Sequence, residues 1–140
     1  MPVSDYVPTG CGPVDELLDG GLERGAVTQV YGPPAAGKTN LALSAAIEVA
    51  AGGDAALYID TEGLSPDRMG QIARGRAEGT SQTVDDLAGR LIVSEAYDYD
   101  EQAEAVQDAA EFAPEVELVV LDSATGFYRL RRDDDDGGET

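Results

Sequence analysis

The stretch Gly-Pro-Pro-Ala-Ala-Gly-Lys-Thr at 32–39 has the residue types and the spacing of a phosphate-binding loop. In the pattern G-x-x-x-x-G-K-[ST], small residues let backbone N–H groups curl closely around phosphate oxygens. Lys38 can reach the β- and γ-phosphates, and the Thr39 hydroxyl can ligate Mg²⁺. The stretch therefore predicts a site for a nucleoside triphosphate, ATP, with Mg²⁺. The residues expected to hold the nucleotide are Gly32, Pro33, Pro34, Ala35, Ala36, Gly37, Lys38, Thr39 and Asn40.

Lys38 is the only lysine among nine basic residues, and the other eight are arginines. A compact ammonium on a flexible stem fits between phosphate groups, whereas a broad planar guanidinium does not enter the same space. The chain therefore keeps a lysine at the one position where this chemistry requires it. We expect Lys38 to take part in catalysis as well as in binding.

Two carboxylates extend this predicted site. Asp122 ends the apolar run "VELVVLD" at 116–122, where a carboxylate can hold the Mg²⁺ shell, often through water. Glu62 follows "LYID" and could polarise a water molecule for attack on the γ-phosphate. The alternatives are a turn residue at a strand end for Asp122 and a charge flanking a helix for Glu62.

Strand-like and helix-like segments alternate along the chain, which predicts an α/β fold with a parallel sheet, flanking helices and right-handed crossovers. The almost wholly apolar run at 116–122 suits a parallel strand that is covered on both faces. Ser65 with Pro66, and Asp98 with Glu101, predict helix starts. The expected strands are 26–31, 55–60, 90–94 and 116–122, and the expected helices are 38–51, 66–77, 84–88 and about 99–112.

The composition is strongly acidic, with 28 acidic residues against nine basic ones and a formal net charge of −19 in 140 residues. Such self-repulsion destabilises the compact state in dilute salt, but at about 1 M salt the Debye length falls to about 3 Å and most of the penalty disappears. The near absence of lysine favours the solvated surface of a halophilic protein over an acidic protein of ordinary cytosol.

The cysteine and histidine content and the lack of long apolar runs argue against several classes of protein. The chain has one cysteine, Cys11, and no histidine, which excludes an internal disulfide and argues against a structural zinc site. It has no apolar run of about 18 residues, and its first ten residues are polar and acidic rather than signal-like. We therefore expect a protein of the cytoplasm without a membrane span.

Four stretches together resemble the RecA/RadA superfamily of P-loop ATPases, and within it the archaeal RadB group. They are "PTGCGPVDELLDGGLERGAVTQVYGPPAAGKTNLAL", "LYIDTEGLSPDRM", "IVSEAYDYDEQ" and "LVVLDSATGFYRL". The resemblance implies a RecA-like P-loop NTPase core that is incomplete at the C-terminal side. Residues 1–130 would be the N-terminal part of the ATPase domain, and 131–140 an acidic tail.

The resemblance also assigns roles to residues. Gly32 to Thr39 matches the Walker A loop, Asp122 the Walker B aspartate and Glu62 the glutamate that activates water. Arg68 in "SPDR" matches an arginine that stacks on adenine; an exposed helix arginine is the alternative. The expected DNA contacts are Arg129, Arg131 and Arg132. Because Asp133–Asp136 follow these arginines directly, surface ion pairing is an equally good interpretation of them.

Two departures from the superfamily pattern matter. Before the strand expected at 26–31 we expect no helix-hairpin-helix domain. RadB-like proteins also lack this domain, and its absence would favour an accessory or mediator protein over a strand-exchange recombinase. The chain also stops at Thr140, before the strand that in this superfamily lies between the Walker A and Walker B strands. We therefore expect a truncated or split product whose sheet lacks its centre.

Three functions fit these observations. The first is an ATP-binding DNA repair and homologous recombination protein with weak ATP hydrolysis. The second is a non-catalytic, ATP-gated adaptor for a recombinase or a junction nuclease. The third is a KaiC-like signalling ATPase, against which "IVSEAYDYDEQ" argues. The charge of −19 makes the chain a poor general binder of DNA, so the expectation of a DNA partner comes from the resemblance alone.

Overall fold

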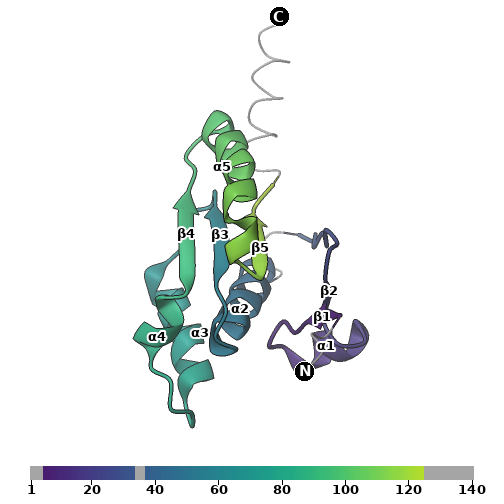
Figure 1. Cartoon of the computed structure of the whole chain (residues 1–140), viewed down its shortest axis with the longest axis vertical. Coiled ribbons are helices and arrows are strands. Elements are labelled where there is room, and N and C mark those ends of the chain that lie inside the picture. The colour runs from purple at the N-terminus through teal and green to yellow at the C-terminus, as the bar shows by residue number, and fades with distance from the viewer. Residues whose placement is uncertain (1–4, 34–36, 125–140) are drawn as a thin grey trace, which may run out of the picture.

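The computed structural model describes residues 5–33 and 37–124, which form a parallel sheet with helices on both faces and a smaller N-terminal unit (Figure 1). The sheet contains β3 (Ala56–Asp60), β4 (Leu91–Glu95) and β5 (Leu118–Asp122) in the order β4-β3-β5. Both neighbours run parallel to β3, so the predicted α/β architecture is confirmed. No described helix is long and apolar enough to cross a membrane.

The register of the sheet brings three carboxylates to one edge. Asp60 lies opposite Glu95 on one side and opposite Asp122 on the other, at the carboxyl ends of the three strands. Every residue of β3 is buried, because this central strand is covered on both faces. Residues that directly follow the three strands therefore lie at the same edge of the sheet.

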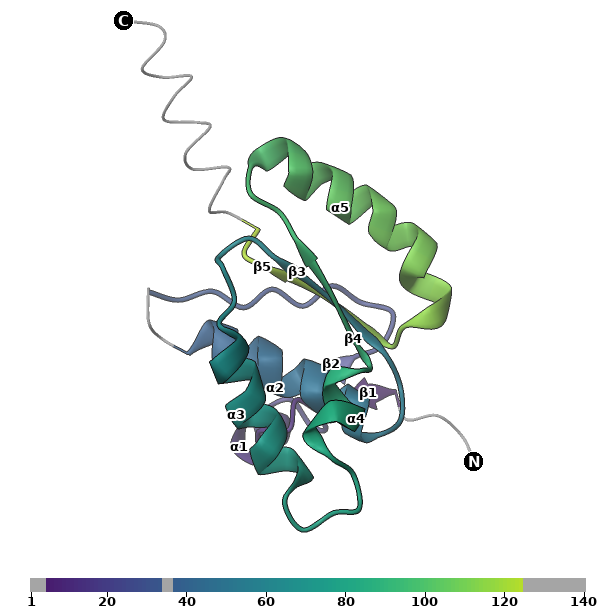
Figure 2. The same ribbon diagram turned by 90° about the vertical axis from the view of Figure 1, so that its left-hand side faces the viewer.

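The helices form a layer on each face of the sheet (Figure 2). α2 (Lys38–Ala51), α3 (Pro66–Ala77) and α4 (Val84–Ala88) cover one face, and α5 (Tyr99–Phe112) covers the other, followed by η1 (Ala113–Glu115). Tyr58 packs with Leu43 and Ala46 on the α2 side, and Leu57 and Ile59 pack with Ala109 on the α5 side. The core is thus two apolar layers separated by β3.

The helix starts follow the predicted signals. The Ser65 hydroxyl accepts a hydrogen bond from the Arg68 amide at 3.4 Å, and Pro66 opens α3. Asp98 accepts from the Glu101 amide at 2.8 Å at the start of α5. The Glu101 carboxylate in turn accepts from the amide of Tyr97, one residue before Asp98. These local hydrogen bonds satisfy amides that have no partner inside the helix.

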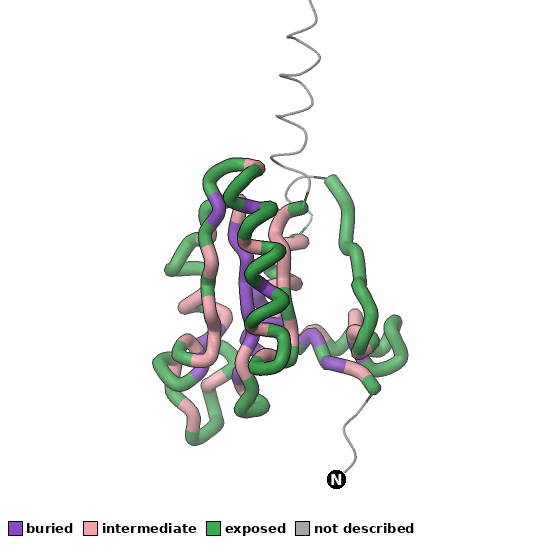
Figure 3. Tube along the Cα trace, turned by 45° about the horizontal axis from the view of Figure 1, so that its top comes forward, coloured by how far each residue is buried: buried purple, intermediate pink, exposed green. Residues whose placement is uncertain are grey.

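The strand expected at 26–31 is wrong. This run pairs with no other strand among the described residues, and its side chains are exposed, with Val27 99% and Tyr31 85% accessible. Figure 3 shows it as an exposed stretch that leads away from the N-terminal unit. Alternating apolar residues favour a strand only when a neighbouring strand takes up the backbone hydrogen bonds. Within the described residues β5 pairs with β3 alone, so no such neighbour lies beside 26–31.

The N-terminal unit was not predicted from the sequence. It consists of β1 (Tyr6–Val7), α1 (Gly12–Leu17) and β2 (Leu22–Glu23), with β1 and β2 antiparallel. Buried Thr9 anchors this unit: its hydroxyl donates to Asp15 at 2.7 Å, and its carbonyl accepts from the Ser44 hydroxyl of α2 at 2.7 Å. The unit therefore fixes the start of the run that leads to the phosphate-binding loop.

Candidate functional site

The predicted phosphate-binding stretch, 32–39, follows the exposed run 26–31 in the sequence and ends in the first turn of α2. Gly37 is the N-cap of α2 and has a φ of +94°, in the left-handed region that favours glycine. The Lys38 ammonium donates to the carbonyl of Gly32 at 2.8 Å, across the base of the loop. Gly32, Pro33 and Asn40 are exposed, whereas the predicted contacts at 34–36 lie outside the described residues. Gly37 is exposed, so the N-terminus of α2 faces solvent, as a phosphate site requires.

Thr39 and Asp122, which are 83 positions apart, meet at the start of α2. The Thr39 hydroxyl donates to Asp122 Oδ2 at 2.9 Å. Tyr58 Oη donates to the same oxygen at 2.7 Å. The structure therefore brings together the two residues that the sequence assigned to Mg²⁺, and adds a tyrosine to them.

Tyr58 is fully buried, and its environment favours the neutral phenol. Burial raises the pKa of Tyr58 well above its usual range, and the hydrogen bond to Asp122 and that negative charge raise it further. The charge of Arg68 acts in the opposite direction and lowers this pKa. The phenol of Tyr58 therefore remains a hydrogen-bond donor to Asp122.

Glu62 lies at the same edge because β3 and β5 are joined beyond their last paired residues. The Thr61 hydroxyl accepts from the Ser123 amide at 2.7 Å and donates to the Ser123 carbonyl at 3.0 Å. The Ser123 hydroxyl then donates to Glu62 Oε1 at 2.7 Å. The exposed Glu62 carboxylate is thus held beside the residue that follows Asp122.

Asp60 holds the turn that presents Glu62. Its side chain is buried and accepts hydrogen bonds from the amide of Glu62 at 2.9 Å and from the amide of Leu64 at 2.5 Å. Each carboxylate oxygen accepts one of these bonds, so Asp60 shapes the backbone of the turn that leads to Glu62 and Leu64. Sequence reasoning missed Tyr58, Asp60, Thr61 and Ser123; the polar letters inside and after "LYID" and "VVLD" were the available signals.

The arginines assigned to ligands have different positions. Arg68 lies exposed in the first turn of α3, near enough to Tyr58 for its charge to act there. Its stacking on adenine stays a prediction. Arg129, Arg131 and Arg132 lie outside the described residues, so their contact with DNA stays a prediction too.

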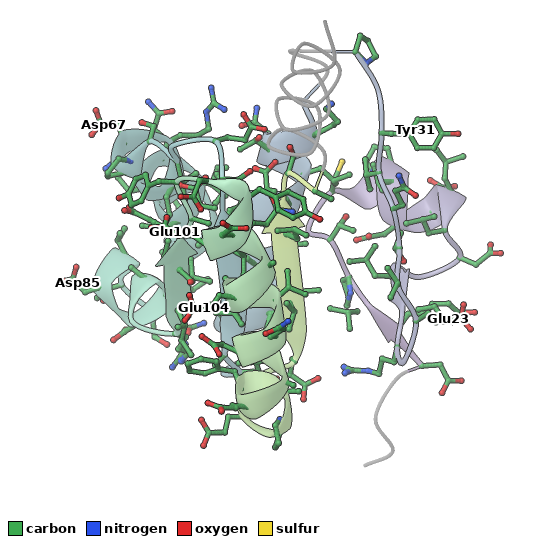
Figure 4. The ribbon with its side chains drawn as sticks, turned by 90° about the horizontal axis from the view of Figure 1, so that it is seen from above. Glu23, Tyr31, Asp67, Asp85, Glu101 and Glu104 are labelled. Atoms are coloured by element: carbon green, nitrogen blue, oxygen red, sulfur yellow. The ribbon has the colours of Figure 1, made fainter. Side chains whose placement is uncertain are left out.

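Charged side chains elsewhere in the described part are mostly carboxylates that project into solvent. Figure 4 looks onto the carboxyl edge of the sheet and shows Glu23, Asp67 and Asp85 pointing outward from three different elements. Two of the described arginines form ion pairs, Arg24 with Glu117 and Arg76 with Glu48 at 2.7 Å, and Arg90 donates to the Ala50 carbonyl at 2.7 Å. The described surface therefore offers no broad basic patch for a nucleic acid.

The sequence profile of the Rad51 family matches residues 5–136, which is almost the whole chain. The chain belongs to the Rad51 family. Among curated Rad51-family relatives, it is 56% identical over 131 residues to the DNA repair and recombination protein RadB of Halobacterium salinarum, covering 94% of this chain and 54% of that protein. It is 41% identical to RadB of Methanococcoides burtonii, covering 96% of this chain and 57% of that one.

A solved structure supports the same placement. The crystal structure of the RadB recombinase superposes with a TM-score of 0.75 at 37% identity, covering 90% of this chain and 55% of that one. The resemblance to the RadB group and the RecA-like fold predicted from the sequence are thus confirmed. The chain spans about half the length of the curated relatives that it matches.

Proposed function

We propose that this chain is the nucleotide-binding part of a RadB-like DNA repair and recombination protein that binds ATP with Mg²⁺ and hydrolyses it slowly. The observation that carries the proposal is the hydrogen bond of 2.9 Å between Thr39 and Asp122. It joins the end of a G-x-x-x-x-G-K-T loop to a carboxylate at the end of a parallel strand, which is the arrangement that holds Mg²⁺ beside a triphosphate.

The donor set fits the nucleotide and the metal. Lys38, which donates to the Gly32 carbonyl, would turn its ammonium to the phosphate oxygens. The Thr39 hydroxyl can continue to donate its hydrogen bond to Asp122 while a lone pair of its oxygen faces Mg²⁺. The other oxygen of Asp122 can accept a hydrogen bond from a metal-bound water. When bound, Mg²⁺ supplies charge neutralisation at the phosphates.

Glu62 would orient the attacking water. Its carboxylate lies at the site edge and receives one hydrogen bond from Ser123. This bond fixes the side chain, and its exposure gives it access to water. A carboxylate so placed can accept a proton from a water molecule that attacks the γ-phosphate. Residues 1–130 would make up this ATPase part, with 131–140 as an acidic tail.

Nucleotide binding, measured in high KCl with a fluorescent ATP analogue, tests the proposal. The wild-type chain should bind the analogue in EDTA and more tightly with Mg²⁺. Asp122→Asn should keep the affinity for the analogue in EDTA. The factor by which Mg²⁺ increases that affinity should fall about tenfold, because the negative charge that holds the metal shell is gone. Asp108→Asn, which removes an exposed carboxylate from α5, is the matched control and should behave as wild type. A wild-type chain that binds no nucleotide would contradict the proposal.

An ATP-gated adaptor without catalysis is the second candidate, and the exposure of Glu62 favours it. Water activation works best in a site that excludes bulk solvent, and this carboxylate is open on one side. Single-turnover hydrolysis separates the two functions. Glu62→Gln should slow the chemical step by about a hundredfold if Glu62 is the base, while Glu104→Gln on α5 stays at the wild-type rate. Equal rates for all three proteins would favour the adaptor.

DNA and a recombinase or junction-nuclease protein are the proposed partners. The relatives' names, DNA repair and recombination protein RadB, support a role at DNA. Anisotropy of a labelled single-stranded oligonucleotide across a KCl series tests the direct contact. Replacing Arg129, Arg131 and Arg132 by alanine together should weaken binding and flatten its salt dependence. Unchanged binding in the triple variant would remove these arginines from the interface.

A further inference from the structure

We propose that Tyr58 is a positioning residue for the Mg²⁺ site: its phenol fixes the orientation of the Asp122 carboxylate, so that the second oxygen of that group is presented to the metal shell. This inference rests on the proposed nucleotide function. It adds a residue that no phosphate-binding motif contains, on the strand next to the one that carries Asp122.

The contacts on Asp122 are asymmetric. Both Thr39 Oγ1 and Tyr58 Oη donate to Oδ2, at 2.9 Å and 2.7 Å. Two donors on one oxygen fix the rotation of the carboxylate about its last bond and direct the other oxygen elsewhere. Thr39 would itself be a metal ligand, so among the described residues Tyr58 is the side-chain donor to Asp122 that lies outside the metal shell. Hydrogen-bonded partners of this kind commonly set the orientation of metal-holding carboxylates.

Tyr58 is held too firmly to follow a moving carboxylate. Its ring is fully buried in the cluster that includes Leu43 and Ala46 of α2, and its backbone lies in the middle strand of the sheet. The same helix carries Thr39 at its start. The phenol and the threonine hydroxyl are therefore two donors fixed on one packed unit, and Asp122 is held between them.

A purely structural role makes a different prediction. A buried phenol needs an acceptor, and Asp122 provides one. On that account, Tyr58→Phe would lower the free energy of unfolding and leave the metal dependence of nucleotide binding unchanged. On our account, the same substitution changes the metal dependence, because Asp122 gains freedom to turn when one of its two described side-chain donors is lost.

The test uses the full chain in high KCl, with Tyr58→Phe and Tyr97→Phe as a matched pair. Tyr97 also donates to a carboxylate, Glu95, at the same edge of the sheet but away from Thr39 and Asp122. Binding of a fluorescent ATP analogue is followed in EDTA and as Mg²⁺ is titrated. Tyr58→Phe should raise the half-saturating Mg²⁺ concentration about tenfold and keep the EDTA affinity within about twofold. Tyr97→Phe should match the wild type in both measurements.

The possible outcomes distinguish a failure of this inference from a failure of the proposed nucleotide-binding function. A wild-type chain that binds the analogue, together with a Tyr58→Phe variant whose Mg²⁺ midpoint does not move, overturns the role of Tyr58 and leaves the proposed function intact. A wild-type chain that binds no analogue at all overturns both. A drop in EDTA affinity equal to the drop in Mg²⁺ affinity would mean that the loop itself was disturbed, which also overturns the inference.

A second measurement does not depend on the folding of Tyr58→Phe. Site-specific 3-fluorotyrosine at position 58 keeps both the ring and the hydroxyl. Its fluorine resonance should stay near its ligand-free position when the ATP analogue is added in EDTA, and should move when Mg²⁺ is added. A resonance that ignores Mg²⁺ while binding tightens would show that the phenol is not connected to the metal side of the site.

Discussion

Individual side chains at the carboxyl edge divide into those that the sequence identifies and those that only the fold reveals. Lys38 and Thr39 are predicted from spacing alone, because the phosphate-binding pattern is a local motif. Tyr58 and Ser123 could not be found in this way. Their partners, Asp122 and Glu62, lie 64 and 61 positions away, and the register of β3 against β5 decides these contacts. No single-sequence pattern encodes that register.

Lys38 carries the prediction at the residue scale. Lys38→Ala should lower the affinity for an ATP analogue at least about tenfold, because one charge-assisted contact to the phosphates is lost. Lys38→Arg should be nearly as damaging, since the planar guanidinium does not fit the same space. Isothermal titration of the analogue in high KCl checks both. Arg76→Ala, which breaks an ion pair with Glu48 on the surface, is the control. Wild-type affinity in Lys38→Arg would refute the steric argument.

Whole elements show the same division. α3 and α5 begin where their caps predict, because a helix is closed by its own hydrogen bonds and by residues near its ends. The run 26–31 is rich in apolar residues but forms no strand among the described residues. A strand needs a partner strand, which can be far away in sequence. β1 and β2 are too short, at two residues each, to show any periodicity.

Gly21 tests how firmly the N-terminal unit is held. A Cβ at this position would lie 2.3 Å from the Val7 carbonyl oxygen, and φ is +136°. Gly21→Ala should therefore lower the free energy of unfolding by roughly 2 kcal/mol or more, since both the backbone and the packing are incompatible with a side chain. Gly12→Ala, where the new atom meets nothing within 4 Å, is the matched control. Denaturant unfolding in high KCl measures both, and equal effects would contradict the close approach.

At the scale of the whole molecule, charge is the dominant property. A net charge of −19 is spread over 140 residues, and acidic side chains project outward from several elements (Figure 4). The composition alone predicted this surface. The relative in Halobacterium salinarum agrees with the interpretation that the composition suits high salt. What composition could not predict is that the described sheet has only three strands, with the exposed run 26–31 apart from it.

The charge leads to a prediction about salt. The free energy of unfolding should rise as KCl increases from about 0.1 M to about 1 M, because the Debye length falls from about 10 Å to about 3 Å over that range. Urea denaturation at several KCl concentrations measures it, since urea adds no ionic strength. A free energy of unfolding that does not change with KCl concentration would contradict the halophilic interpretation.

The exposed run 26–31 has a consequence for cooperativity. The run begins two residues after Arg24, which pairs with Glu117 just before β5. At its other end it continues in sequence into the predicted phosphate-binding stretch. A strand that came to pair with this run would fix its backbone by hydrogen bonds just before the predicted phosphate-binding stretch. Pairing and nucleotide binding would then share a coupling free energy, and each would strengthen the other by the same factor. The nucleotide would thereby act as an effector of strand pairing, and strand pairing as an effector of nucleotide binding.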